Sequence, residues 1–240
     1  MSILDLVVPD LSFRRHQAEL MDDPGLDPVR HRRALRALGR VNRISFAAER
    51  VWGEVRRLHE EMQRPVRVLD IACGGADVLV HIARQARRSG VPVELSGCDI
   101  SPVALAEARR LASGEAAVDV FELDVLREDL PSGFDLMTTS LFLHHLSRED
   151  AVALLRRMSE RTERALLVQD LRRTRLGYVL AWVGLHTLTT SDVARADGLV
   201  SVRAAFTTEE VADLCREAAL IRAEIAYGWP QRFTIRWERA

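Results

Sequence analysis

Short apolar runs alternate with helix-like segments along the central part of the chain. Each run is bounded by turn residues, which is the pattern of buried parallel strands joined by crossover helices. The runs are Val66–Ile71, Val93–Asp99, Val118–Leu123, Phe134–Thr139 and Arg164–Gln169. Two further runs, Leu220–Ala226 and Arg232–Trp237, predict a hairpin-like pair of strands at an edge. We therefore predict an α/β fold with an open sheet.

The segments on either side of these strands carry other patterns. Between Leu35 and Met62, apolar residues recur at steps of three and four, which predicts an amphipathic helix or a broken pair of helices. Residues 172–206 contain a nearly continuous apolar run, Leu176–Leu185. At ten residues it is half of the ~20 needed to span a bilayer. A buried helix, a substrate lid and an interfacial segment all remain open for this run.

Composition narrows the classes of function. With 240 residues and an apolar fraction of 48%, the chain can form one α/β domain with an appended cap. Its net charge of −1 argues against electrostatic binding of nucleic acid, which requires a basic excess. The chain has no lysine, which excludes Schiff-base chemistry and a Walker-type phosphate-binding lysine.

Cysteine usage and the N-terminal residues indicate the compartment. Cys73, Cys98 and Cys215 are odd in number and form no CxxC pair, which is typical of a reduced protein. Asp5 and Asp10 interrupt any apolar core of a secretion signal. We therefore expect a cytoplasmic protein with no integral membrane span.

The first apolar run ends in a turn of small residues, Ala72 to Ala76, and a helical pattern follows it. Such a turn lets a ligand lie against bare backbone at a helix N-terminus. The second run ends in Asp99. An acid that binds ribose hydroxyls is expected ~20 residues beyond such a turn, and Asp99 lies close to that position. The third run is followed by Asp124. Successive strands with polar groups at their carboxyl ends predict a ligand crevice in an open α/β sheet.

These motifs occur in an order that resembles the class I S-adenosylmethionine-dependent methyltransferases. The segments that carry the resemblance are Val68–Asp77, Gly97–Ser101, Leu123–Val125 and Phe134–Leu146. The subgroup that the chain most resembles contains the ubiquinone/menaquinone-type and small-molecule methyltransferases. Ala72 and Ala76 stand where the family pattern usually has glycine; because alanine is the smallest replacement, we expect binding to be kept.

The resemblance covers roughly residues 60–240 and implies a domain organisation. We expect a Rossmann-like seven-stranded sheet flanked by helices, with an N-terminal helical cap and a helical lid insertion after strand five. The cap is predicted at 1–62 and the S-adenosylmethionine-binding domain at 63–240, with the lid at 172–206.

The resemblance also implies S-adenosylmethionine as the cofactor and a set of residues that contact it. These are Asp70, Ala72, Cys73, Gly74, Asp99, Ile100, Asp124, Val125 and Ser140. Asp70 would contact the methionine ammonium directly or through water, and Asp99 would accept hydrogen bonds from the ribose hydroxyls. Asp124, with the backbone of Val125, would accept from the adenine amino group. The alternatives are a surface acid at Asp99 and a helix cap at Asp124.

His144 and His145 follow the fourth predicted strand, where the acceptor lies in the resembling family. A histidine can take a phenol or hydroxyl proton near neutral pH. We predict that one of the pair is a general base, with His144 slightly favoured, and that the other acts mainly on stability. The alternative is that both only pack and form hydrogen bonds in their loop.

Asp170 ends the fifth predicted strand and is the candidate for a catechol-type metal site. It is followed by Leu171 and two arginines instead of further oxygen ligands, so we expect no metal and activity that survives chelation. Arg172 could hold an acidic group of the substrate. Tyr178 and Trp182 could form apolar walls of the acceptor pocket.

The preferred function is O-methylation of a phenol, quinol or polyketide-like hydroxyl on a small, aromatic or lipid-like acceptor, within secondary metabolism. C-methylation of a quinone-type ring is the close alternative. A non-catalytic S-adenosylmethionine-binding protein and a nicotinamide oxidoreductase also remain open. Neither nucleic acid nor an integral membrane span is expected, and the chain could be a monomer or a homodimer.

Overall fold

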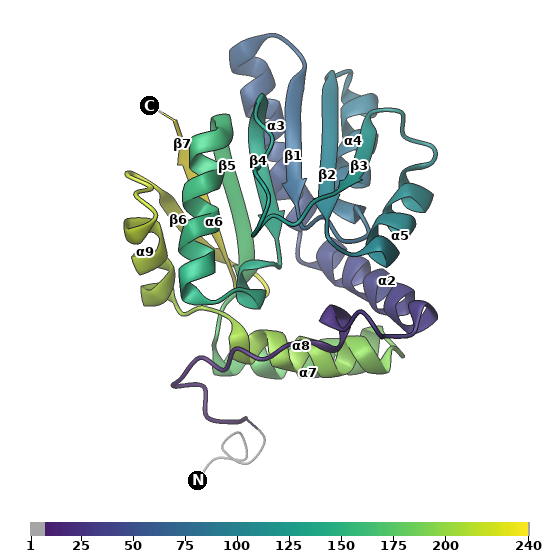
Figure 1. Ribbon diagram of the computed structural model, residues 1–240, viewed down its shortest axis with the longest axis vertical. Helices are drawn as coiled ribbons and strands as arrows, with labels where there is room; N and C mark the ends of the chain where they lie inside the picture. The colour runs from purple at the N-terminus through teal and green to yellow at the C-terminus, as the bar shows by residue number, and fades with distance from the viewer. Residues whose placement is uncertain (1–7, 240) are drawn as a thin grey trace.

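The computed structural model describes residues 8–239, and it is built around a seven-stranded sheet (Figure 1). The strands are β1 Val66–Ile71, β2 Val93–Asp99, β3 Val118–Glu122, β4 Phe134–Ser140, β5 Thr162–Leu171, β6 Glu224–Gly228 and β7 Arg232–Glu238. Their order is β3-β2-β1-β4-β5-β7-β6. The first five strands pair in parallel, whereas β7 is antiparallel to both β5 and β6. The predicted Rossmann-like seven-stranded sheet is confirmed. The predicted cap and lid both include helices of the cover described below, but residues 1–7 of the cap, with Asp5, and Ala240 lie outside the described residues.

The helices follow the predicted alternation with the strands. They are α2 Pro28–Ile44, α3 Ala47–Met62, α4 Asp77–Ser89, α5 Pro102–Ala112, α6 Arg148–Arg161, α7 Arg175–Leu188, α8 Asp192–Ala204 and α9 Thr208–Glu217, with the short 3-10 helices η1 Leu20–Asp22 and η2 Leu143–His145. Side-chain oxygens of Asp27, Ser101, Ser147 and Thr207 accept backbone hydrogen bonds in the first turns of α2, α5, α6 and α9.

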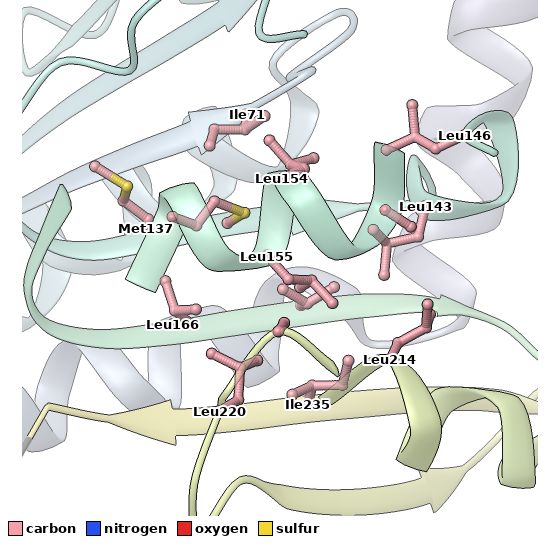
Figure 2. Packing of buried hydrophobic residues seen from close by; sticks show 14 of the residues in the cluster. Ile71, Met137, Leu143, Leu146, Leu154, Leu155, Leu166, Leu214, Leu220 and Ile235 are labelled. Carbon is pink, nitrogen blue, oxygen red and sulfur yellow. The ribbon is translucent and has the colours of Figure 1, made fainter. Parts of the chain in front are cut away.

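Apolar side chains are buried on both faces of the sheet. On one face, α3 and α4 pack through residues such as Val55 and Leu79. On the other face lie α6 and α9, and Figure 2 shows Leu154 and Leu155 of α6 among side chains from the sheet, including Met137. The sheet is therefore the central layer of three, and its strand ends are left for other elements to cover.

A helical cover lies over the carboxyl ends of the parallel strands (Figure 1). It consists of η1, α2, α7 and α8, which contact one another although they come from both ends of the chain. The predicted amphipathic stretch at 35–62 is a broken pair, because Phe46 adopts a left-handed backbone between α2 and α3. Of that pair, α3 packs on one face of the sheet and α2 belongs to the cover.

The apolar run of the predicted lid forms most of α7. Only Gly177 and Leu185 are buried in this helix, while Leu176, Trp182 and Val183 are exposed, so it is not a buried core helix. Among residues 8–239, no helix is long and apolar enough to cross a membrane.

Candidate active site

A cavity of about 980 Å³ separates the sheet's carboxyl edge from the helical cover. Its volume is at the upper end of the usual range for small-molecule sites, so two ligands can share it. One half is lined by the ends of β1 to β4 and the turns that follow them. The other half is lined by η1, α2, α7, α8 and the start of β7.

The turn after β1 has an unusual backbone that its sequence only partly suggests. Ala72, Gly74 and Ala76 all have positive φ angles, of 53°, 53° and 57°. A left-handed conformation costs an alanine about 1–2 kcal/mol and a glycine almost nothing. The glycines that are usual in the resembling family at positions 72 and 76 thus have a physical reason, and this chain tolerates the strain.

Gly97 of β2 allows this turn to approach the neighbouring strand. A Cβ atom at Gly97 would lie 2.7 Å from Leu79 Cδ1 and 2.8 Å from Cys73 Sγ, both closer than side chains pack. The Cys73 amide donates to the Cys98 carbonyl at 2.9 Å, which fixes the turn against β2. Bare backbone and small side chains therefore form a cradle below the cavity.

Asp99 lines the cavity at the end of β2, as predicted. Its two carboxylate oxygens accept hydrogen bonds from the amides of Gly74, at 2.9 Å, and Ser101, at 2.8 Å. Each oxygen keeps a further acceptor site, which suits a pair of vicinal hydroxyls. Burial raises the pKa of Asp99.

Asp124 lines the cavity and also caps its own turn. Its Oδ1 accepts from the Leu126 amide at 3.0 Å, so the capping alternative describes one part of its role. Val125 and Ile100 lie beside it on the cavity wall, the first buried and the second exposed.

Asp70 is not among the residues that line the cavity within the described part of the chain. It is buried in β1, where burial raises its pKa well above the usual range, and its Oδ1 has no hydrogen-bond partner among the described residues. Ser140 lines the cavity and also has a buried oxygen without a partner there. Asp77, at the start of α4, is the carboxylate that reaches the wall near this turn, and it accepts from Asn42 Nδ2 at 3.2 Å.

His144 is buried between two carboxylates. Its Nδ1 lies 2.7 Å from Asp170 Oδ1, and its Nε2 lies 3.4 Å from Glu19 Oε1. Burial alone would lower the pKa of His144, but the charges and hydrogen bonds of Asp170 and Glu19 raise it to about 10. Because both ring nitrogens of His144 face carboxylates, neither is turned toward an acceptor hydroxyl, which argues against its predicted role as the general base.

His145 lies on the cavity wall with its ring against that of His144, at a centroid distance of 4.4 Å. Its Nδ1 is 3.3 Å from Asp22 Oδ2, and its Nε2 is 3.8 Å from Glu19 Oε2. As predicted, the two adjacent histidines have different environments.

Glu19 and Asp22 come from η1 and its flank, which the sequence analysis did not single out. Asp197 of α8 accepts from the amides of Leu20, at 2.8 Å, and Met21, at 3.1 Å. Ser201, one turn further along α8, donates to Glu19 Oε1. Helix α8 therefore anchors the N-terminal segment and holds its two carboxylates against the histidine pair.

The half of the cavity under the helical cover is otherwise mostly apolar. Its aliphatic lining includes Leu35, Leu38, Val41, Ile44, Leu180, Leu185, Leu188 and Val202. Among the predicted substrate-binding residues, Arg172 lines the cavity with its guanidinium 4.6 Å from the Tyr227 ring centroid. Within residues 8–239, Tyr178 and Trp182 are not part of this lining, and Trp182 instead stacks on His186 at the surface.

Arg232, at the start of β7, is a cavity residue that the sequence analysis missed. Its side chain is buried, and Nη2 donates to Asn42 Oδ1 at 3.3 Å. Its Nε and Nη1 have no partner among the described residues. Burial lowers the pKa of Arg232 to about 10. A buried guanidinium with two unused donor groups is costly unless an anion or other acceptor binds there.

Comparisons with known proteins agree with this geometry. Residues 68–164 match the family model of a methyltransferase domain. No curated protein sequence matches the chain significantly.

Solved structures show the same fold at low sequence identity. An S-adenosylmethionine-dependent methyltransferase from Aquifex aeolicus has 15% identity and a TM-score of 0.60, with 90% of this chain and 100% of that one covered. The magnesium protoporphyrin IX methyltransferase ChlM from Synechocystis, with bound S-adenosylhomocysteine, has 15% identity and a TM-score of 0.57, with 82% and 83% covered. An O-methyltransferase family 2 protein from Planctomyces limnophilus, in complex with apigenin, has 16% identity and a TM-score of 0.54. That match covers 75% of this chain but only 52%, about half, of the larger protein.

Residues 68–164 thus match a methyltransferase domain, and the fold of the chain is the one found in solved S-adenosylmethionine-dependent methyltransferases. The antiparallel β7 inserted between β5 and β6 also differs from the six-strand order of nicotinamide-binding domains.

The described residues fit S-adenosylmethionine. The cradle at Gly74 and Gly97 admits a ligand against bare backbone, and Asp99 has acceptor capacity left for hydroxyls. Unpartnered buried oxygens of Asp70 and Ser140 lie near the same strand ends. We propose, on the donor and acceptor chemistry of these groups, that the cofactor binds in this half of the cavity, named the cofactor half, and the acceptor in the half under the helical cover, named the acceptor half.

Proposed function

We propose that the enzyme methylates a hydroxyl group of a small, largely apolar acceptor, such as a phenol, quinol or polyketide-like compound. The observation that carries the proposal is the composition of the acceptor half of the cavity. Aliphatic side chains from α2, α7 and α8 line much of this half, and Glu19, His144 and His145 form a polar cluster on its wall. An apolar molecule with one reactive hydroxyl suits such a chamber.

S-Adenosylmethionine, when bound, supplies an electrophilic methyl group on a sulfonium. The protein's part is to orient the acceptor and exclude water. The cover helices line the chamber with aliphatic side chains, and the polar cluster offers the hydroxyl a hydrogen-bonding partner. Arg172 and Arg232 offer donors to further oxygen atoms of a polyoxygenated acceptor.

Two further observations support a phenolic or quinone-type acceptor and a cytoplasmic location. The neighbour from Planctomyces limnophilus was solved with apigenin, a phenolic compound, and the subgroup resemblance includes quinone-type methyltransferases. The free thiols of Cys73, Cys98 and Cys215 are all buried, which supports a cytoplasmic enzyme, and we propose a role in secondary metabolism.

The test is an assay of the full chain with S-adenosylmethionine and a panel of phenols, quinols and aliphatic alcohols. Mass spectrometry should show one added methyl group on a phenol or quinol, and fragmentation should place it on oxygen. A methyl group on ring carbon would support the C-methylation alternative instead. No product from any hydroxyl acceptor, while S-adenosylhomocysteine still binds, would contradict the proposal.

A further inference from the structure

We propose that Glu19, His144 and His145 form a binding site for a divalent transition-metal ion at the acceptor end of the cavity. Each residue offers a ligand atom, and these atoms all lie within 4.8 Å of one another. Two imidazoles and one carboxylate are a donor set that suits first-row transition ions better than Mg²⁺ or Ca²⁺.

The spacing of the three side chains fits one shared ion. His144 Nε2 and His145 Nε2 lie 3.4 and 3.8 Å from the two oxygens of Glu19. Ligands bound to one ion at ~2.0–2.2 Å lie roughly 3–3.5 Å apart in a tetrahedral site. Small side-chain movements are therefore enough to bring all three ligands onto an ion.

Both histidines are already oriented as metal-binding histidines are. His144 presents its Nδ1 to Asp170 at 2.7 Å, and His145 presents its Nδ1 to Asp22 at 3.3 Å. A carboxylate on Nδ1 fixes the ring and directs Nε2 to the metal, the usual outer-shell arrangement. In both rings the atom left for the metal is the Nε2 that faces Glu19.

The outer groups are themselves held in place. Asp170 accepts from the His144 amide at 2.9 Å and from the Leu171 amide at 2.6 Å. Glu19 accepts from the Ser201 hydroxyl. These contacts limit the rotation of the ligands, so that the site is formed before an ion arrives.

The local charge also favours a cation. Three carboxylates, those of Glu19, Asp22 and Asp170, surround the two rings, and Glu19 and Asp170 are only 5% and 1% exposed. Buried carboxylates need a positive partner, and a divalent ion supplies more charge than one imidazolium. The prediction that no metal binds rests on Asp170 alone. In the structure, Asp170 lies behind His144. The proposed ligands are Glu19, His144 and His145.

All three ligands line the cavity, so the ion would keep open positions toward the acceptor. A hydroxyl that takes an open position releases its proton to water more readily, which would give the reactive oxygen without a histidine base. This consequence rests on the proposed function, whereas the metal site itself does not.

The test is a titration of the chelator-treated full chain with Co²⁺, followed by absorption and calorimetry, without acceptor or S-adenosylmethionine. We expect one Co²⁺ per chain and d–d absorption bands of a nitrogen- and oxygen-ligated ion. Glu19→Gln and His145→Ala should each weaken binding by about 100-fold or more, since even outer-shell changes cost about 10–100-fold. Asp22→Asn should weaken it by about 10-fold.

The matched control is His186→Ala, which removes an exposed histidine of α7 outside the cluster and should leave Co²⁺ binding unchanged. Circular dichroism checks that each variant is folded. No Co²⁺ binding to the wild-type chain, equal binding to Glu19→Gln, or a thiolate charge-transfer band from the cavity residue Cys73 would overturn the assignment. Because no acceptor is present, this result is separate from the outcome of the methylation assay.

Discussion

The two halves of the cavity are built in different ways. In the cofactor half, the cradle and Asp99 come from neighbouring strand ends, and both oxygens of Asp99 are engaged by backbone amides. In the acceptor half, η1, α2, α8 and β7 bring together side chains that lie far apart in the sequence. Arg232 there keeps two unpartnered donor nitrogens, and His144 is enclosed by charges.

The comparison shows which half of the cavity is held in place by hydrogen bonds within the protein and which half contains buried charges that lack a partner. In the cofactor half, two backbone amides hold the Asp99 carboxylate in place, and the groups without a partner there are the buried oxygens of Asp70 and Ser140. The acceptor half contains buried charges that only a ligand or counter-ion can satisfy, which is typical of functional sites. Mutations should therefore affect stability and function together in the cofactor half and in opposite directions at some positions of the acceptor half.

The largest effect on stability is expected at the histidine pair. His144→Ala leaves the carboxylates of Asp170 and Glu19 buried without their common partner, so unfolding in urea should become about 3–5 kcal/mol easier. His145→Ala is the matched control; its ring is less buried, and we expect a loss of about 1 kcal/mol but a fall in turnover of roughly 100-fold. Equal stability losses in the two variants would remove the distinction that the structure draws.

Arg232→Met should separate stability from function. Replacing a buried, poorly partnered guanidinium by an apolar side chain is expected to stabilise the fold by about 1–2 kcal/mol and to lower kcat/KM by at least about 10-fold. Arg236→Met on the same strand is the control: Arg236 is paired with Glu54 at 3.0 Å, so its loss should destabilise the fold. A destabilised Arg232→Met protein would show that this arginine serves the fold and not a ligand.

The smallest effect is expected in the cradle. Ala72→Gly removes the cost of a left-handed alanine and should stabilise the protein by about 0.5–1 kcal/mol in thermal unfolding. Ala86→Gly, in the interior of α4, is the comparison and should destabilise by about 1 kcal/mol or more. If Ala72→Gly also destabilises, the strain attributed to this turn is not there.

The sequence predicts the cofactor half well because its signals are local. Strand β1, the small-residue turn and Asp99 follow from adjacent residues, and the structure confirms the strand ends to within one or two residues for β1, β2 and β3. Asp70 and Asp77 belong to the same sequence motif. Only the three-dimensional arrangement shows that Asp77 lines the cavity and that Asp70 does not.

The acceptor half was much less predictable. Glu19 reaches the histidines because Asp197 and Ser201 of α8 anchor η1, and no local pattern connects residues so far apart. Arg232 lies in a strand that the sequence predicts as part of an edge hairpin; the structure inserts β7 beside β5, which brings the start of that strand to the cavity. The sequence predicts Tyr178 and Trp182 as aromatic walls, but the helical phase of α7 directs aliphatic residues to the cavity instead.

We propose that the cofactor half binds the methyl donor through Asp99. Calorimetry with S-adenosylhomocysteine tests it most directly, comparing Asp99→Ala with Glu122→Ala, which removes the exposed acid paired in register on β3. Loss of charged hydrogen bonds should weaken binding to Asp99→Ala by about 1–3 kcal/mol, or about 5- to 150-fold, while Glu122→Ala binds like the wild type and NAD binds to none of the proteins. Unchanged affinity in a folded Asp99→Ala variant, or binding of NAD to the wild-type chain, would contradict the account.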